Sequence, residues 1–492
     1  MTDTNKKSYR PAQRIGLIAG AVVFILILLV PPPSGLSVEA WRTAAVALLM
    51  ATWWMTEALP IQATALLPLA LFPALGVLDA NDASAPYANR TIFLFMGGFL
   101  LAVTMQKWGL HKRIALEIMA FVGTSANRLI LGFMIATAFL SMWISNTATV
   151  AMMLPIGLAV GEMFKPLDKK GPYEFGIALM LGVAYGASIG GVSTLIGTPP
   201  NAVLAAQANE LLGIQIGFIQ WMGVGLPFTI VMLPLTWLLL TRILYPPGDL
   251  SGDAGALIEK ERRSLGKMSR GEKLTALVFG LTALAWVLRQ EKDFGSITIP
   301  GIQTWMPFVY DSTIAMAAAI VLFVLPVNWR KGEFVLDWKT ASKIPWGILV
   351  LFGGGLSLAR AMSDSGLAEW IGTAVGALET VPTIVIIAAI VTLIVFLTEL
   401  TSNIATTNMA MPIMAGAAVG LDIPPLMLMA TAALAASMAF MLPVATPPNA
   451  IVFGSGYLTV PQMSRAGIVL NLIAIVAITA MGTFLVPFFL AV

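Results

Sequence analysis

The sequence predicts an all-α membrane protein that crosses the bilayer many times. Of its 492 residues, 58% are hydrophobic and only 11% are charged, whereas soluble domains carry about 25% charged residues. Many stretches run about 17 to 25 residues with almost no charge, which is the length needed to cross ~30 Å of hydrocarbon. The cations gather in short gaps between these stretches, as is typical of loops on the cytoplasmic side.

The positions of the cations predict the topology. Of the 28 Lys and Arg residues, 23 fall into groups at residues 6–14, 107–128, 165–170, 242–273, 330–343 and 465. The positive-inside rule places all of these groups in the cytoplasm. We therefore expect a multi-pass protein of the cell's inner (plasma) membrane, with residues 1–14 as a cytoplasmic N-terminus and the C-terminus on the extracytoplasmic side.

Eleven transmembrane helices satisfy both the hydrophobic stretches and the cation groups. We expect them at residues 15–31, 38–57, 59–79, 91–108, 173–207, 217–244, 273–289, 311–327, 345–362, 426–457 and 466–490. Residues 112–128 are expected to lie along the interface. The first crossing has no small-residue cleavage site, so it predicts a retained helix and not a signal peptide.

Two further apolar segments have a polar break in the middle and are predicted to be re-entrant helical hairpins. The first, at about residues 126–162, has cations near both ends, so both ends should be cytoplasmic. The second, at about residues 383–420, has no Lys or Arg near either end and is expected to enter from outside. Such a break is tolerated at membrane depth only where it is buried in protein or lines a water-filled cavity.

The polar breaks belong to an internal repeat. Ser-Asn-Thr-Ala-Thr occupies residues 145–149, and Ser-Asn-Ile-Ala-Thr occupies residues 402–406, 257 residues later. The same offset relates "FMGGFLLAVTMQKWGL" at 95–110 to "FGGGLSLARAMSDSGL" at 352–367. Three ordered matches, the third of which is described next, indicate that the two halves are homologous.

The third match is Gly-Thr-Pro-Pro-Asn, which begins at Gly197, and Ala-Thr-Pro-Pro-Asn, which begins at Ala445, 248 residues later. The repeats are therefore residues 15–245 and 273–492, with a cytoplasmic loop at 246–272 between them. Because the hairpins enter from opposite sides, the repeats are expected to have inverted topology. Inverted repeats with broken helices are typical of secondary transporters, whose sites lie near the midplane where the repeats meet.

The duplicated phrases suit a site that holds an anion beside a hard cation. Helix N-termini expose N–H groups and the positive end of the helix dipole, whereas helix C-termini expose carbonyl oxygens. Ser, Asn and Thr are neutral and both donate and accept hydrogen bonds. The tandem prolines predict helix breaks at Gly197–Thr198 and Ala445–Thr446 that free carbonyl groups.

Each signal also has a purely structural interpretation. Ser or Asn at a helix start is most often an N-cap, proline in a membrane helix is often a kink, and the glycines at 97–98 and 353–355 suit close helix packing. Duplication at matched places favours function for the Ser-Asn and Thr-Pro-Pro-Asn phrases. Glu57 and Glu399 are candidate proton relays, although a scaffold role with a hydrogen-bonded partner is the stronger interpretation for both.

The inventory of residues argues against an enzyme. The chain has no cysteine, which excludes disulfides and thiolate metal sites, and its one histidine, His111, stands beside two cations and is expected in a solvated loop. No Lys or Arg falls within the Ser-Asn or Thr-Pro-Pro-Asn segments. A polyanion bound there would therefore need its charge balanced by helix dipoles and by co-bound cations, which favours cation-coupled import over an exchanger of one anion for another. A gated anion channel would need a ring of basic residues.

These paired motifs resemble those of the divalent anion:sodium symporter family over essentially the whole chain. Members of that family import dicarboxylates such as succinate, malate and fumarate, or citrate, or sulfate. The resemblance implies a homodimer in which each protomer has a scaffold domain that dimerises and a transport domain that holds the hairpins. The transport domain would move as an elevator, with sodium ions as coupling ions and no other cofactor.

The resemblance also assigns residues to the site. Substrate contacts fall on Ser145, Asn146, Thr147, Thr198, Ser402, Asn403, Ile404, Thr446 and Pro447. One sodium site comprises Ser141, Ser145, Asn146 and the carbonyl of Gly197, and the other comprises Thr398, Thr401, Asn403 and the carbonyl of Ala445. Asn146 and Asn403 would touch both sodium and substrate, which would couple their binding.

Ile404 departs from the motif, because some relatives have Thr at this position. The change removes a hydroxyl and adds an apolar wall, so it bears on the shape and charge of the anion. We expect sodium-coupled import of C4-dicarboxylates by an elevator mechanism. The alternatives are a sodium-independent dicarboxylate or citrate exchanger of the same fold, and a sulfate or citrate symporter.

Overall fold

The computed structural model describes residues 10–123, 125–164, 173–248, 254–293, 298–376 and 380–490. The cations at residues 6–7 and 165–170, most of the expected N-terminal segment, and residues 249–253 of the inter-repeat loop lie outside this description. The described chain is mostly helical, and its only strands form two short antiparallel pairs.

The first half of the chain forms a series of helices. They are α1 (Pro11–Leu29), α2 (Val38–Thr56), α3 (Ile61–Thr64), α4 (Leu67–Ala74), α5 (Ala80–Ser84), η1 (Ala85–Ala88), α6 (Arg90–Lys107), α7 (Leu110–Val122), α8 (Ala126–Ser141), α9 (Asn146–Met163), α10 (Glu174–Gly191), α11 (Pro199–Leu212), α12 (Phe218–Leu238) and the π-helix η2 (Leu239–Leu244).

The second half adds the strand pairs. Its elements are α13 (Ala254–Ser264), α14 (Arg270–Leu288), β1 (Lys292–Asp293), β2 (Thr298–Ile299), α15 (Ile302–Trp305), α16 (Asp311–Val324), β3 (Pro326–Asn328), η3 (Trp329–Lys331), β4 (Glu333–Phe334), α17 (Trp338–Ala341), α18 (Trp346–Asp364), α19 (Leu367–Val375), α20 (Thr383–Thr398), α21 (Asn403–Gly420), α22 (Pro425–Ala436), α23 (Pro447–Phe453) and α24 (Val460–Leu490).

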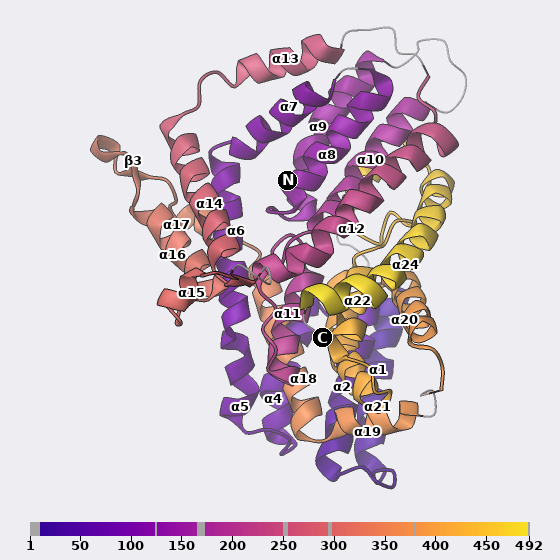
Figure 1. The fold of residues 1–492 in the computed structure, drawn as a ribbon. Coiled ribbons are helices and arrows are strands. Elements are labelled where there is room, and N and C mark those ends of the chain that lie inside the picture. The colour runs from indigo at the N-terminus through magenta and orange to yellow at the C-terminus, as the bar shows by residue number, and fades with distance from the viewer. Residues whose placement is uncertain are drawn as a thin grey trace, which may run out of the picture.

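The two halves interlock (Figure 1). Helix α11 of the first half packs against α21 and α22 of the second, and α23 of the second half packs against α9 and α10 of the first. In Figure 1, α7, α8, α9 and α13 lie in the upper part of the molecule, whereas α19 and α21 lie at its lower end. Segments from both repeats therefore meet in the interior.

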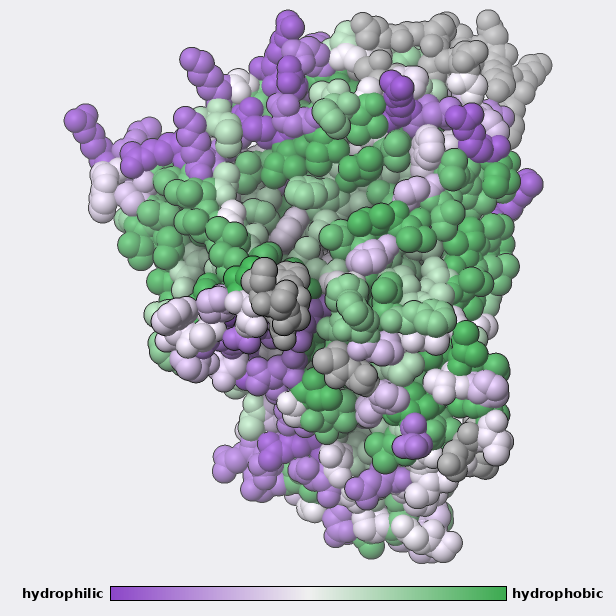
Figure 2. Space-filling view, in the orientation of Figure 1, coloured by the Kyte–Doolittle hydropathy of each residue, from purple (hydrophilic) through white to green (hydrophobic). Residues whose placement is uncertain are grey.

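The surface has the character of a membrane protein (Figure 2). A belt of hydrophobic residues covers the upper middle of the view, and hydrophilic residues gather above it, around α7 and α13, and at the lower end of the molecule. Among the described helices, seven are long and apolar enough to cross a membrane, and five shorter apolar helices accompany them. The lipid-facing side of such helices stays apolar because hydrocarbon solvates it.

Three of the expected crossings are interrupted in the structure. Residues 59–79 form the two short helices α3 and α4, and residues 173–207 and 426–457 each form two helices joined by a non-helical connector. Proline explains the interruptions, because it cannot donate a backbone hydrogen bond and disfavours helix just before it. Pro68 lies in the first turn of α4, and tandem prolines begin α11 and α23.

Helix α7 is tied to α13 and α14 by ion pairs across the upper end of the molecule. Lys112 pairs with Glu261 at 2.9 Å, and Arg113 pairs with Glu272 at 2.9 Å. His111 was expected in a solvated loop, but it lies half-buried in the first turn of α7, with Nδ1 3.1 Å from the carbonyl oxygen of Met105. The helix starts earlier than expected because Gly109 adopts the left-handed conformation at its N-cap.

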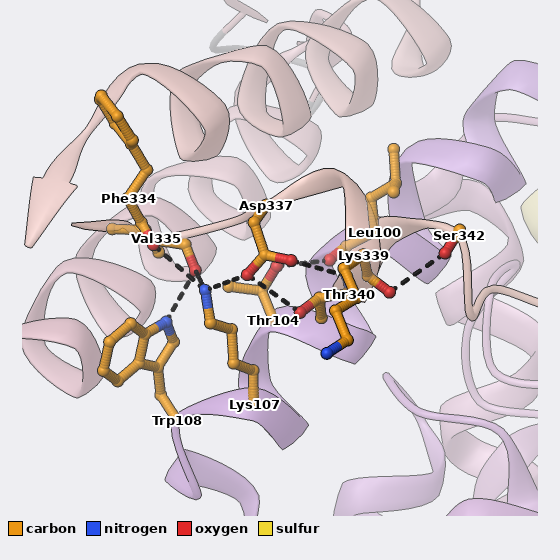
Figure 3. Close-up of polar contacts among 10 residues, drawn as sticks. All are labelled: Leu100, Thr104, Lys107, Trp108, Phe334, Val335, Asp337, Lys339, Thr340 and Ser342. Carbon is orange, nitrogen blue, oxygen red and sulfur yellow. Dashed lines mark hydrogen bonds and ion pairs between the residues drawn. The ribbon is translucent and has the colours of Figure 1, made fainter. Parts of the chain in front are cut away.

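A second polar cluster joins α6 to the segment around β4 and α17 (Figure 3). The Nζ atom of Lys107 donates to Oδ2 of Asp337 at 2.6 Å and to the carbonyl oxygens of Phe334 and Val335. The indole of Trp108 also donates to Val335. Mainly because Lys107 donates to it, the pKa of Asp337 lies below its usual range.

This ion pair predicts acid-sensitive stability. A lowered pKa in the folded state gives stability that is present above the ordinary aspartate pKa of about 3.9 and is lost as the pH falls through the lowered value. We expect Asp337→Asn to lower the melting temperature of the purified protein at neutral pH, and the difference from wild type to shrink on acidification. A difference that stays constant with pH would contradict the role of the pair.

Candidate functional site

Both hairpins have the same local geometry at their tips. In the first hairpin (α8 and α9) the hydroxyl of Ser141 donates to Oδ1 of Asn146 at 2.6 Å, and in the second (α20 and α21) the hydroxyl of Thr398 donates to Oδ1 of Asn403 at 2.8 Å. Each bond links the last residue of one helix to the first residue of the next. The repeated sequence therefore produces a repeated structure.

The serines of the two phrases stand at helix N-caps. Ser145 precedes α9 and its Oγ accepts from the N–H of Ala148 at 3.4 Å, while Ser402 precedes α21 in an extended conformation. The capping interpretation is thus correct for Ser145, whereas the Ser402 side chain stands at the N-cap position without making a capping hydrogen bond. Both serines also line the cavity described below.

Two non-helical connectors complete the frame. The first connector (residues 192–198) joins α10 to α11, and the second connector (residues 437–446) joins α22 to α23. Both begin well before the breaks expected at Gly197–Thr198 and Ala445–Thr446. The sequence marked only where each helix restarts, because proline signals the start of α11 and α23 but not the end of the preceding helix.

A buried asparagine holds each connector. The Nδ2 atom of Asn201 donates to the carbonyl oxygens of Val192 at 3.1 Å and Thr194 at 2.7 Å. Asn449, 248 residues later, donates in the same way to the carbonyl oxygens of Ala439 and Leu442. These carboxamides supply donors to carbonyls that a broken helix would otherwise leave without partners.

The tips and the connectors surround one cavity of about 610 Å³. Its walls come from both repeats and include α3 of the first and α18 of the second. The lining residues are Glu57, Ile61, Ser145, Asn146, Thr147, Thr198, Pro199, Pro200, Ile348, Leu400, Thr401, Ser402, Asn403, Ile404, Val444, Ala445, Thr446, Pro447, Pro448 and Ala450.

The structure brings all nine residues expected to contact substrate to this cavity. Two of the expected sodium ligands, Thr401 and Ala445, also line it. The other three outside the substrate set, Ser141, Gly197 and Thr398, are buried behind the lining residues.

Close backbone packing brings together the residues at the first hairpin tip and the end of the first connector. A Cβ atom on Gly197 would lie 2.8 Å from the carbonyl oxygen of Ser141 and 2.3 Å from that of Gly191. A Cβ atom on Gly191 would lie 2.4 Å from Oδ1 of Asn146. Ser141, Asn146 and Gly197 therefore converge on one small region, which is what a shared cation site would require.

Several lining and supporting residues were not foreseen from the sequence. Ile61, Ile348, Leu400 and Val444 add apolar walls, and no motif marks them. Asn201 and Asn449 support the connectors, and the signal that could have found them is their place as the last letter of the duplicated Thr-Pro-Pro-Asn phrase. Such a phrase repeated at matched positions implies a role for each of its members.

The cavity is polar but has little fixed charge. Among its lining residues, Glu57 is the only ionisable side chain, and it is an exposed C-cap residue of α2 in the left-handed conformation. The N-terminal residues of α9 and α21, Asn146 and Asn403, both face the cavity. Helix N-termini attract anions, so the cavity can hold an anion without a basic side chain.

A helical fold with two broken hairpins around one shared cavity is the construction of a secondary transporter. The sequence matches the family described as the sodium:sulfate symporter transmembrane region over residues 12–490. The chain belongs to this family, and it is a transporter and not an enzyme.

The relatives agree with this assignment over nearly the full chain. A protein of Staphylococcus saprophyticus described as the sodium-dependent dicarboxylate transporter SdcS is 45% identical, with 98% of this chain and 93% of that protein covered. The SdcS protein of a Staphylococcus aureus strain is 42% identical, with 99% and 94% covered. The fold is similar to the crystal structure of the Alcanivorax borkumensis YdaH transporter, with a TM-score of 0.60 at 15% identity over 91% of this chain and 98% of that one.

The packing at Gly191 gives a test of the site. In Gly191→Ala the new methyl would push the Asn146 side chain away from Ser141, because the contact of 2.4 Å is too short for any real Cβ. We expect the initial transport rate of the reconstituted protein to fall at least about tenfold, because displacing a side chain that lines the site by about 1 Å can cost more than that.

The matched control is Gly280→Ala on α14, where a Cβ would meet nothing within 4 Å. Alanine also favours helix over glycine, so this variant should transport as well as wild type. Equal transport by the two variants, with equal amounts of protein in the membrane, would show that the Gly191 contact does not shape the site.

Proposed function

We propose that this protein imports C4-dicarboxylates such as succinate, malate and fumarate, coupled to the entry of sodium ions. The observation that carries the proposal is a cavity built from paired Asn-hydroxyl tips whose lining contains no Lys or Arg. A dianion bound there needs its charge balanced by helix dipoles and by co-bound cations. The name of the SdcS relatives supports both the dicarboxylate and the sodium.

The proposed ligands come from the matched phrases of both repeats. The substrate would contact the nine lining residues named above, from Ser145 to Pro447. One sodium would bind at Ser141, Ser145, Asn146 and the carbonyl of Gly197, and the other at Thr398, Thr401, Asn403 and the carbonyl of Ala445. Hydroxyl, amide and carbonyl oxygens are suitable ligands for a hard cation.

The same proposal covers topology and motion. The chain would have eleven crossings and two re-entrant hairpins in inverted repeats, residues 15–245 and 273–492, joined by a cytoplasmic loop at 246–272. A transport domain with both hairpins would move as an elevator against a scaffold domain that forms a homodimer. The N-terminus would face the cytoplasm of a bacterial-type inner membrane, and the hydrophilic end around α7 and α13 would lie on that side.

The decisive experiment measures radiolabelled succinate uptake into proteoliposomes with an inward sodium gradient, compared with choline replacement. We expect uptake to accumulate succinate above equilibrium only with sodium. Asn146→Ala and Asn403→Ala should each abolish this uptake while leaving the protein in the membrane. Succinate uptake that ignores sodium but requires internal dicarboxylate would make the protein an exchanger instead.

Sulfate is a second candidate cargo, because the family description names a sodium:sulfate symporter. Citrate is a further candidate. If either is the preferred cargo, unlabelled sulfate or citrate would inhibit succinate uptake more strongly than unlabelled malate does. Alternatively, labelled sulfate would accumulate in the proteoliposomes while labelled succinate would not. Either result would keep the sodium coupling and change the substrate.

Ile404 is the residue most suited to setting substrate preference. It lines the cavity at the third position of the second phrase, where the first phrase has Thr147. We expect Ile404→Thr to change the order in which malate, fumarate, citrate and sulfate compete with succinate, while the sodium concentration at half-maximal uptake changes little. A competition profile identical to that of wild type would exclude this role.

A further inference from the structure

Glu399 lies just behind the second hairpin tip and is bound entirely by donors. Its carboxylate is buried, with 3% of the residue exposed. Oε1 accepts from the N–H groups of Phe440 at 2.6 Å and Met441 at 2.9 Å and from Nδ2 of Asn471 at 2.8 Å. Oε2 accepts from the N–H of Leu442 at 3.2 Å. Three consecutive peptide groups of the second connector therefore point at one carboxylate.

This arrangement suits an ionised carboxylate. A protonated acid would need an acceptor for its own O–H group, whereas all four hydrogen-bond partners of Glu399 are donors. Hydrogen bonds from N–H groups to a carboxylate are charge-assisted and strong. Glu399 is therefore better suited to be a fixed anion than a proton relay.

The carboxylate also fixes the direction of the second connector. Because the N–H groups of residues 440–442 face Glu399, their carbonyls are turned to other partners: Phe440 accepts from the Tyr185 hydroxyl at 2.8 Å and Met441 from Ser464 at 3.1 Å. Leu442 accepts from Asn449. Hydrogen bonds therefore fix residues 440–442 just before the connector reaches the cavity at Ala445.

The first repeat has no equivalent charge. The position 257 residues before Glu399 is Met142. Neutral groups hold the first connector instead: the Trp221 indole donates to Val192 at 2.9 Å, and the Thr194 hydroxyl donates to the Met142 carbonyl oxygen at 2.5 Å. The two pseudo-symmetric regions therefore have the same ligand types but different electrostatics.

We propose that Glu399 is a positioning residue that makes the second sodium site, at Thr398, Thr401, Asn403 and Ala445, the tighter of the two. This inference rests on the proposed function. A fixed anion next to one site favours a cation there. The same anion repels a substrate dianion more strongly when that cation is absent.

The test follows thermal stability of the purified full-length protein as sodium chloride replaces choline chloride, without substrate. We expect sodium to raise the melting temperature of wild type. Glu399→Gln should need at least about tenfold more sodium for half of that rise, which is the size of effect seen when a residue supporting a metal ligand is changed. The sodium dependence of succinate uptake should shift by a similar factor.

Tyr185→Phe is the matched control, because it removes a hydrogen bond to the same connector but keeps the charge. Its half-stabilising sodium concentration should stay close to wild type. If Glu399→Gln does not fold, Asn471→Ala removes one donor to the carboxylate, and it should shift the sodium response in the same direction by less.

The proposal is overturned if Glu399→Gln needs no more sodium than wild type for half of the rise in melting temperature. It is also overturned if Tyr185→Phe raises that sodium concentration as much as Glu399→Gln does. If Glu399→Gln does not fold, an unchanged sodium response in Asn471→Ala overturns it. In these cases wild type still responds to sodium, so the proposed function stands. A wild-type protein that neither responds to sodium nor takes up succinate with it would overturn both.

Discussion

Every backbone group that a broken helix exposes inside an apolar protein must find a partner, and the structure of this transporter depends on that constraint. Tandem prolines restart α11 and α23 without donating N–H groups. The carboxamides of Asn201 and Asn449 then satisfy carbonyls of the two connectors. Because these connectors are held open, the cavity can form between them and the hairpin tips.

The repeat solves the problem of binding a charged molecule without burying a fixed cation. Each half supplies a helix N-terminus, an Asn-hydroxyl pair and a non-helical connector, and the halves meet through α11, α21 and α23. A buried cation or anion is costly unless it is paired. An anion and its co-bound cations therefore depend on one another in such a cavity, which is the physical basis for coupled transport.

The two halves are nevertheless not equivalent. Ile404 replaces the hydroxyl that Thr147 offers at the matched position, and Glu399 stands where the first half has Met142. The first difference acts on the shape of the cavity wall, and the second acts on the charge behind it. A repeated framework thus leaves room for one wall to set substrate preference and for one site to differ in cation affinity.

The sequence by itself determined the membrane class, the duplication and the polar phrases that line the cavity, because hydropathy, cation placement and repeated polar phrases are local signals. It did not predict where α10 and α22 end, since Asn201 and Asn449 stabilise the connectors through contacts with residues up to ten positions away. Only the tertiary structure decided that Ile61 and Ile348 join the cavity and that Glu399 faces residues 440–442, because these contacts join segments distant in the chain.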